Sequence, residues 1–569
     1  MSLLLALPAL WLAYLMFTYA VDIPYGDQWD GIAPLFAKMR AGTLGFGDFF
    51  AFHNEHRIFF PRLLIFPLAK LTHWNVRAEV GLIFVLACLC AVNIWRIALA
   101  TGFRRERSLF GLFLLVNLML FTPMQWENVL WGFQVGFFLP LVTITALPWT
   151  ASVGRRPTNF VLTMILCLVT TFSIASGFTS WLLATPLLWF GRERQHSRRE
   201  WILWVIWIAI AVASVLLYFH GYKGPDRHPN QWEALQEPVL LCQFILAYLG
   251  NPFCAGTQLD RSLVAQLMGG TLLIFLVVAV IYLWRWRKDR ELVGRALPWV
   301  SLSCFTLISA VLTMFGRINY GIDGAIQSRY VSFAVLLPIG LLFLGALIGK
   351  HCRVQNPRRA ETLRLDYAIS ITVFALLFFF STNAALRIWP MFQHDRLTGK
   401  AVLALRNLVD EPRAIARYVH HDAARARELA DALDQVSYLR PQPLRSAHIR
   451  EIARPTGGMK MGALQGATQG PDGHVIASGW AVLPMSDRVA DSVILAYEKD
   501  DGDPIIFARA NVNKLRDDIA AELGDPAYRL CGWELNWAPE SVPKDAIRVT
   551  AWAFDAETLS AYEVGFFRL

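Results

Sequence analysis

Long apolar runs, separated by short polar segments, occupy most of the first 390 residues. A bilayer with a hydrocarbon core of about 30 Å requires roughly 17–25 apolar residues of a helix that crosses it. Eleven runs, a few of them shorter than this, predict membrane-spanning helices. They cover residues 3–20, 80–98, 109–121, 135–149, 160–173, 178–190, 201–219, 263–284, 297–315, 331–348 and 367–382.

Two further apolar stretches predict something other than a full crossing. Residues 58–74 contain Pro61, Arg62, Pro67 and Lys70, and a lipid-facing helix rarely tolerates that many polar and helix-breaking residues. We therefore expect an interfacial or re-entrant segment there. The stretch at 240–250 is too short to cross comfortably and predicts a re-entrant helix.

The pattern changes after residue 390. Residues 391–455 predict a helical linker, because they contain good helix formers with apolar residues at three- and four-residue spacing. Short alternating runs then predict strands at 474–483, 491–499, 504–512, 531–537, 546–554 and 561–569. The expected fold class is an α-helical polytopic membrane protein (1–390) with a C-terminal all-β sandwich-like domain (456–569).

Composition and charge agree with a membrane protein. Of the 569 residues, 55% are hydrophobic and 17% are charged, which excludes an ordinary soluble domain. Alternate loops, counted from a cytoplasmic N-terminus, carry 19 Lys/Arg in 50 residues, against 11 in 135 for the other set. This asymmetry predicts that the acidic loop and the C-terminal domain lie on the outer, periplasmic face. It also explains the net charge of +9 without a nucleic-acid partner. Residues 3–20 lack a basic leader and a convincing cleavage site, which predicts a retained first span.

The first outer loop, residues 21–62, is rich in carboxylates, and two of them lie in the sequence YGDQWD. A carboxylate within hydrogen-bond reach of a hydroxyl accepts its proton and makes it a better nucleophile. Asp27 and Asp30 are therefore candidate catalytic residues. A solvated loop explains them equally well, and Asp30 could instead be the N-cap of the next helix.

The same loop ends in candidate binding residues. Glu55 and His56 could ligate a metal, assist the base or pair with Arg57, and a salt-bridged turn is the simpler interpretation. Arg57 and Arg62 lie beside apolar residues, where a guanidinium could hold a lipid phosphate bidentately. Snorkelling to ordinary phospholipid is the alternative.

Later outer loops supply further candidates. Residues 123–134 combine carboxamides with tryptophans, which suits a sugar ring, although an interfacial aromatic belt explains the tryptophans. Residues 316–330 carry two arginines that could neutralise a leaving phosphate or merely anchor helix ends. The candidates are Gln125, Glu127, Asn128 and Gln134, then Arg317, Tyr320, Arg329 and Tyr330. The long loop at 219–262 adds Lys223, Arg227, His228 and Asn251.

Taken together, YGDQWD, QWEN and the late GR…SRY loop resemble the GT-C superfamily of glycosyltransferases that use polyprenyl-phosphate sugars. The resemblance covers about residues 1–400 and is closest to bacterial members that modify lipopolysaccharide O-antigen or cell-wall polysaccharide. It implies that Asp27 is the base, that Asp30 is its partner, and that Arg317 and Arg329 bind the donor phosphate. It implies no certain cofactor, since some members use a divalent cation and others do not.

The function expected from this resemblance is that of an inverting glycosyltransferase of the bacterial inner membrane. It would move a sugar from a polyprenyl-phosphate donor to a glycan or glycolipid acceptor on the periplasmic face. The C-terminal domain is interpreted by analogy as carbohydrate-binding. Three alternatives stay open: an O-antigen polymerase or ligase, a flippase or transporter for lipid-linked sugars, and a non-catalytic glycan-binding protein.

Overall fold

The computed structural model describes residues 2–103, 107–152, 157–191, 198–222, 236–355, 357–469, 474–500 and 502–569. They form two compact units, and each is described by itself. The helical unit comprises Met1–Ala20, Leu44–Lys70 and Arg77–Trp389. The mixed unit comprises Val21–Thr43, Leu71–Val76 and Pro390–Leu569. The predicted first outer loop is thus divided between the two units after Thr43.

Each of the eleven predicted apolar segments coincides largely with a helix, which confirms their secondary structure. The helices are α1 (Ser2–Tyr19), α6 (Val76–Ala100), α7 (Arg107–Leu120), α9 (Val135–Ser152), α10 (Pro157–Thr171), α11 (Ser180–Gly191), α12 (Arg198–Phe219), α15 (Arg261–Arg285), α16 (Arg290–Arg317), α18 (Leu336–Gln355) and α19 (Pro357–Leu386).

Fewer than eleven of these helices have the length of a full crossing. Within the described ranges, eight helices are long and apolar enough to cross a membrane, by length and composition. Shorter apolar helices include α1, α10 and α14 (Pro238–Gly250). The described residues thus supply eight candidate membrane spans, and the expected total of eleven stays a prediction.

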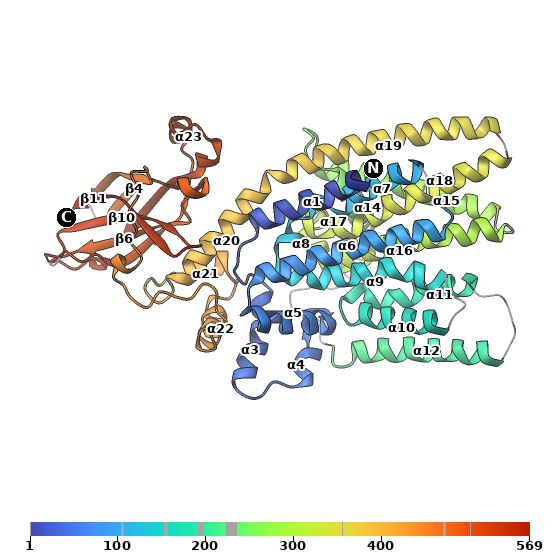
Figure 1. Ribbon diagram of the computed structural model, residues 1–569, viewed down its shortest axis with the longest axis horizontal. Helices are drawn as coiled ribbons and strands as arrows, with labels where there is room; N and C mark the ends of the chain where they lie inside the picture. Colours follow the sequence, from blue (N-terminus) through green and yellow to red (C-terminus); the bar gives the residue numbers. More distant parts are fainter. Residues whose placement is uncertain are drawn as a thin grey trace. The chain divides into compact units, whose positions relative to one another are not determined.

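Close packing organises the helical unit. Helix α9 packs against α10, α11 and α16, and α18 packs against α15, α16 and α19 (Figure 1). Helices α14 and α15 approach most closely through glycines. A Cβ added at Gly250 would lie 1.9 Å from the carbonyl oxygen of Ala265, and one at Gly269 would lie 1.9 Å from that of Leu246. Small residues allow such backbone approach between membrane helices.

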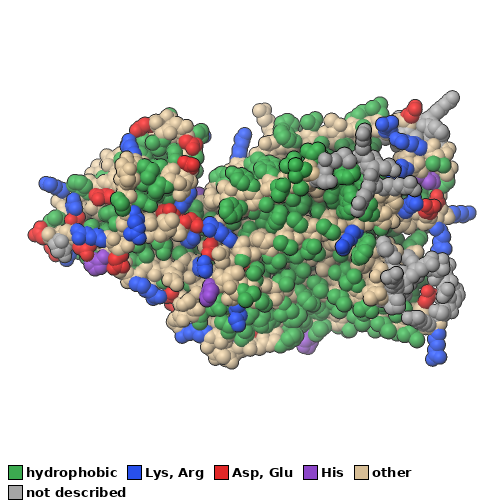
Figure 2. All heavy atoms as spheres, in the orientation of Figure 1, with side chains coloured by type: hydrophobic (Ala, Val, Ile, Leu, Met, Phe, Trp, Pro, Cys, Tyr) green, Lys and Arg blue, Asp and Glu red, His purple; other side chains and the backbone are tan. Residues whose placement is uncertain are grey.

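The surface of the helical unit fits a lipid environment. In Figure 2, hydrophobic side chains cover much of the visible face of the long helices, and Lys and Arg of these helices gather toward their right-hand ends. Large apolar side chains such as Phe275, Ile281 and Phe379 are exposed along α15 and α19. A soluble protein rarely leaves so large a continuous apolar surface uncovered.

Short elements between the long helices hold most of the polar candidates. In the helical unit these are α4 (Phe46–Phe50), β1 (Phe52–His53), β2 (His56–Arg57), α5 (Phe59–Thr72), η1 (Pro123–Gln125), α8 (Trp126–Leu130), η2 (Gly132–Gln134), η5 (Ile318–Tyr320), η7 (Ser328–Tyr330) and α17 (Val331–Ala334). The expected interruption at 58–74 is the 14-residue helix α5, and 240–250 falls in the 13-residue α14.

The mixed unit combines the early polar loop with the C-terminal third of the chain. Its helices are α2 (Gln28–Gly31), α3 (Ala33–Arg40), α20 (Ile388–Ala404, from Pro390 onward), α21 (Pro412–Tyr418), α22 (Ala423–Gln435) and α23 (Asp517–Leu523). Helix α22 confirms one predicted linker helix. It begins where the Asp422 side chain accepts the backbone N–H of Arg425 at 2.9 Å, a typical N-cap.

Strands make up the rest of this unit, and all six predicted runs are among them. They are β3 (Gly462–Gln469), β4 (Val475–Leu483), β5 (Arg488–Val489), β6 (Ser492–Glu498), β7 (Ile505–Ala510), β8 (Val512–Lys514), β9 (Gly532–Trp537), β10 (Arg548–Asp555) and β11 (Ser560–Arg568). Strands β3, β5 and β8 were not predicted. The sequence GALQGATQ of β3 has two glycines and no β-branched residue before its Thr, so it lacks the usual strand signal.

The strands form two antiparallel sheets, in the orders β11–β10–β6–β7 and β3–β4–β9–β8, with β5 paired to β4. Side chains from both sheets enter one buried cluster, including Trp480, Leu495, Trp533 and Val549. The cysteines of the described chain are all free, so packing and not disulfides holds this region together.

The residues predicted as a linker pack onto the early loop. The N–H of Gly26 donates to the carbonyl of Val419 at 2.9 Å, and the rings of Phe36 and Tyr438 lie 4.6 Å apart. Arg440 forms a 3.2 Å ion pair with the largely buried Asp22. Residues 391–455 are thus part of a folded unit and position the predicted catalytic loop.

Candidate functional site

The loop that carries Asp27 and Asp30 is fixed by its own buried residues. Gly26 adopts a left-handed φ of 53°, and the backbone N–H of Tyr25 donates to the side chain of Gln28 at 3.1 Å. The indole of the fully buried Trp29 donates to the carbonyl of Pro24 at 3.0 Å. These contacts leave Asp27 half-buried and Asp30 exposed at its surface.

The capping interpretation of Asp30 is wrong. Asp30 lies inside α2, and the N-cap of the following helix α3 is Ile32. Asp27 occupies the N-cap position of α2, but its side chain makes no capping hydrogen bond. Neither carboxylate is therefore used to start a helix.

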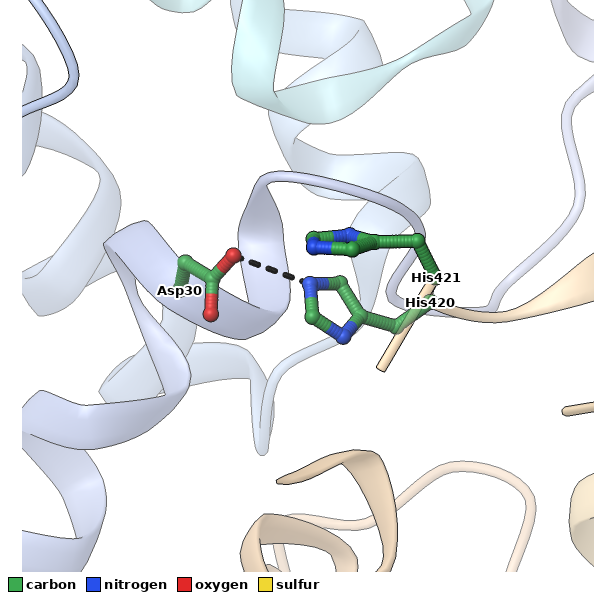
Figure 3. Close-up of side chains that lie close together, drawn as sticks. All are labelled: Asp30, His420 and His421. Carbon is green, nitrogen blue, oxygen red and sulfur yellow. Dashed lines mark hydrogen bonds and ion pairs between the residues drawn. The ribbon is translucent and has the colours of Figure 1, made fainter. Parts of the chain in front are cut away.

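Asp30 instead faces two adjacent histidines from the segment between α21 and α22. Its Oδ2 lies 2.9 Å from Nε2 of His420, as the dashed line in Figure 3 shows. The His420 side chain is 2% exposed and that of Asp30 is 38% exposed. His421 is exposed, and its ring lies 4.2 Å from that of His420, centre to centre.

The electrostatics of His420 follow from these contacts. Burial lowers the pKa of its imidazole, but hydrogen bonds with Asp30 and with the backbone of Asp422 outweigh burial, so the pKa lies above its ordinary value. The charged imidazolium is thus stabilised beside the carboxylate. The arrangement joins residues 390 positions apart in the chain.

Arg396 supports the same loop from α20. Its guanidinium lies 3.4 Å from the centre of the Tyr25 ring and donates to the carbonyl of Tyr418 at 2.9 Å. The side chain is largely buried. This cation–π contact ties the loop to the segment that leads to His420.

The helical unit contains a second group of candidates, built around Arg317 at the end of α16. Arg317 pairs with Glu55 at 3.0 Å, and His56 Nε2 lies 3.5 Å from the same carboxylate oxygen. Asn54, with a φ of 51°, makes the tight turn between β1 and β2 that presents Glu55. His56 Nδ1 accepts the N–H of Ala175 at 3.0 Å, so its neutral ring carries the proton on Nε2. This disfavours His56 as a metal ligand in that state.

Arg57 and Arg62 bind backbone carbonyls. The Arg57 guanidinium donates to the carbonyls of Tyr218, Phe50 and His220 and lies 3.9 Å from the centre of the Phe52 ring. Burial lowers the pKa of Arg57. Arg62 is also buried and donates to carbonyls in the α4–β1 segment. Their predicted role toward a lipid phosphate stays a prediction, and their contacts favour a structural role.

The predicted loop at 123–134 contacts the one at 316–330 through another acid–arginine pair. Glu127 lies 3.0 Å from Arg329, and its side chain is 14% exposed. Asn128 donates to the carbonyl of Arg329 at 2.6 Å and to the hydroxyl of Ser332 at 2.7 Å. Gln125 accepts from Ser332 at 2.6 Å. The two loops are therefore one hydrogen-bonded structure.

The remaining candidates differ in exposure. Tyr330 is buried, lies beside the Arg317 guanidinium, and is within electrostatic reach of Arg329 and Glu127. Tyr320 is exposed. Gln134 is buried, and within the described chain its Oε1 has no hydrogen-bond partner. Tyr330 thus links the two acid–arginine pairs.

The structure describes the predicted site residues as two groups, one in each unit, and their union in one site stays a prediction. The arginine group lies in the helical unit and comprises Glu55, Glu127, Arg317, Arg329 and Tyr330. The acid–histidine group lies in the mixed unit and comprises Asp27, Asp30, His420 and His421. The sequence analysis did not identify the two histidines. The pattern that could have indicated a metal or acid–base site is HHD, His420–Asp422, within a linker rich in Ala and Arg.

The predicted long loop, residues 219–262, lies partly outside the described residues. Lys223, Arg227 and His228 lie outside the described residues. Asn251 is buried and donates to the carbonyl of Gln327 at 2.9 Å, which helps to hold the loop at 316–330.

No protein-family model matches the chain, and the searches of curated proteins and of solved structures likewise found no match.

Proposed function

We propose that this protein is an inverting glycosyltransferase that transfers a sugar from a polyprenyl phosphate to a glycan or glycolipid acceptor. The observation that carries the proposal is the arginine group at the ends of apolar helices. Arg317 and Arg329 are each paired with one carboxylate and share Tyr330 as a neighbour. An incoming phosphate can replace carboxylate oxygens at both guanidiniums, since it offers the same bidentate acceptor geometry.

The acid–histidine group supplies the other half of the proposed chemistry. The acceptor hydroxyl attacks the anomeric carbon, the bond between this carbon and the phosphate oxygen breaks, and the polyprenyl phosphate leaves with the bonding electrons. The hydroxyl proton passes to a carboxylate. We favour Asp27 for this role, because Asp30 already faces His420 at 2.9 Å. Displacement from the opposite face inverts the anomeric centre.

The proposed orientation rests on loop charge. The loops rich in Lys and Arg face the cytoplasm, and the loops of the arginine group face outward. Lipid carriers suit this orientation, because nucleotide sugars are not supplied on the outer face. The proposed location is the bacterial inner membrane, with the C-terminal antiparallel sheets in the periplasm. By analogy, these sheets position or bind the glycan acceptor.

The paired arginines also support one alternative function. A polymerase or ligase that joins lipid-linked oligosaccharides would also use paired arginines, since its donor carries a pyrophosphate. The polymerase or ligase alternative assigns no function to the carboxylate of Asp27. A flippase would instead be expected to place polar groups near the middle of the bilayer.

The experiment supplies purified protein in lipid nanodiscs with three radiolabelled donors: a polyprenyl-phosphate monosaccharide, a polyprenyl-pyrophosphate oligosaccharide and a nucleotide sugar. Candidate glycan acceptors are added, and lipid-linked label is followed over time. The proposal predicts consumption of the first donor alone. Consumption of the oligosaccharide donor alone would support the polymerase or ligase, and no consumption with any acceptor would contradict a transferase.

A further inference from the structure

Asp30, His420 and His421 bring three metal-ligating side chains to one place, and their role goes beyond the proposed sugar transfer. One carboxylate oxygen and one nitrogen from each imidazole lie within 4.8 Å of one another. Figure 3 shows the Asp30 carboxylate directed toward the two rings. Within the described residues, this is the one group of three or more His, Cys, Asp and Glu side chains with such geometry.

The geometry points to a binding site for a divalent transition-metal ion, and we infer that zinc is its preferred ion. Two imidazoles and one carboxylate suit zinc and its neighbours, whereas magnesium and calcium prefer oxygen ligands. Three protein ligands leave a fourth tetrahedral position. Because Asp30 and His421 are exposed, that position is open to water or to a small oxygen ligand.

The distances require only small movements. In a tetrahedral zinc site with bonds of about 2.0–2.1 Å, two donor atoms lie about 3.4 Å apart. The 2.9 Å contact between Asp30 and His420 must therefore open by about 0.5 Å, and the more distant donors must close. The exposed side chains of Asp30 and His421 can make these adjustments. His420 is buried and supplies the fixed ligand.

The surroundings of His420 suit a ligand. Its Nδ1 lies 3.1 Å from the carbonyl oxygen of Asp422 and 3.3 Å from the backbone nitrogen of the same residue. When Nδ1 carries the proton, it donates to the carbonyl, and Nε2 presents a lone pair toward Asp30. An outer carbonyl that holds the second nitrogen in this way fixes the tautomer of many metal-bound histidines.

The site changes how the two early aspartates are understood. Asp30 becomes a metal ligand, and Asp27 keeps the proposed role of proton acceptor. The inference does not depend on sugar transfer, because metal binding is measured directly. The failure of either proposal therefore leaves the other testable.

The test uses the full-length protein in nanodiscs, purified with a tag that contains no histidine. After treatment with a chelator and dialysis, zinc affinity is measured by competition with a fluorescent zinc chelator, and bound zinc is counted by mass spectrometry. The wild type should bind one zinc ion per chain, and an excess of magnesium should not displace it. A wild type that retains no zinc would overturn the inference.

Variants identify the ligands. His421→Ala and Asp30→Asn change exposed side chains and should each weaken zinc binding by more than about 100-fold, beyond the 10–100-fold typical of an outer partner. The matched control is His448→Ala, since His448 also faces an aspartate, Asp503 at 2.7 Å, but belongs to no group of three metal-ligating side chains among the described residues. Circular dichroism confirms that each variant is folded. Wild-type zinc affinity in both ligand variants would contradict the site.

X-ray absorption at the zinc edge gives an independent answer. The site predicts nitrogen and oxygen neighbours at about 2.0–2.1 Å, including imidazole scattering. Zinc held by cysteines elsewhere would show sulfur at about 2.3 Å, and the chain has eight free cysteines. A sulfur shell would therefore overturn the assignment even if the protein bound zinc.

Discussion

The arginine group and the acid–histidine group differ in how they are built. The arginine group lies at the ends of apolar helices and consists of guanidiniums already paired with carboxylates. The acid–histidine group lies on a short polar loop, held by residues that follow it by nearly 400 positions. The first is suited to exchange one anion for another, and the second is suited to bind a cation or accept a proton.

Under the proposed function, this difference assigns donor binding to the arginine group and proton transfer to the acid–histidine group. In the proposed reaction the lipid phosphate needs fixed positive charge, and the arginines at helix ends would provide it. Proton transfer or metal binding needs a carboxylate and imidazoles with access to water, which a surface loop provides. The proposed reaction requires both groups, so changes in one should affect donor affinity and changes in the other should affect the rate of transfer.

The largest effect is expected from the arginine group. Arg317→Gln and Arg329→Gln should each lower sugar transfer by about 10²–10³-fold, the usual cost of removing one group that stabilises developing negative charge. Transfer from the labelled donor measures this. The control is Arg287→Gln, which changes an exposed arginine at another helix end of the same unit. Equal activity in the Arg317 variant and this control would remove the arginine group from the mechanism.

A packing change should damage the helical unit alone. A Cβ added at Gly132 would lie 2.2 Å from the carboxylate of the buried Glu79, so Gly132→Ala should cost about 1–3 kcal/mol of stability. Thermal unfolding in detergent measures the loss. Gly136→Ala is the matched control, because a Cβ there meets nothing within 4 Å. Zinc binding should survive in both variants, and an unchanged unfolding temperature for Gly132→Ala would contradict the predicted clash.

The mixed unit should respond to the loss of Arg396. Arg396→Met removes the contact with the Tyr25 ring and the hydrogen bond to Tyr418, at a cost of about 1–3 kcal/mol. Limited proteolysis should then cut the loop of residues 21–32 faster. Arg413→Met serves as the control, since Arg413 is exposed on α21. Equal proteolysis of the two variants would show that Arg396 does not hold the loop.

The smallest effect is expected at the exposed histidine pair. His448 and Asp503 are 52% and 34% exposed, so His448→Ala should change the free energy of unfolding by about 0–1 kcal/mol. His420→Ala should cost more, because it empties a buried position beside Asp30. Chemical denaturation compares the two variants. Equal losses would show that burial does not distinguish the pairs.

Local patterns in the sequence predicted most of the fold. Apolar runs located the long helices, and alternation located six of the nine strands described in the C-terminal sheets. Helix lengths were less predictable, because helix–helix packing lets short helices such as α10 and α11 join a bundle. Strand β3 was missed because pairing with β4, and not local propensity, decides its structure.

The candidate site was predictable only in part. The acidic loop and both arginines were identified from local composition, but their partners were not. The pairs Glu55–Arg317 and Glu127–Arg329 join residues about 200 or more positions apart. The residues 391–455 looked like a linker, and nothing in their local pattern indicated that His420 would pack against Asp30. Such contacts depend on tertiary folding, which a single sequence does not display.

The central claim is that the arginine group binds the donor and that Asp27 activates the acceptor. The most direct measurement compares equilibrium binding of a radiolabelled polyprenyl-phosphate sugar with single-turnover transfer, in Asp27→Asn and in Arg317→Gln. We predict that Asp27→Asn binds donor as the wild type does but transfers it about 10²–10⁴-fold more slowly, whereas Arg317→Gln loses donor binding. Wild-type transfer by Asp27→Asn, or undiminished donor binding by Arg317→Gln, would contradict the account.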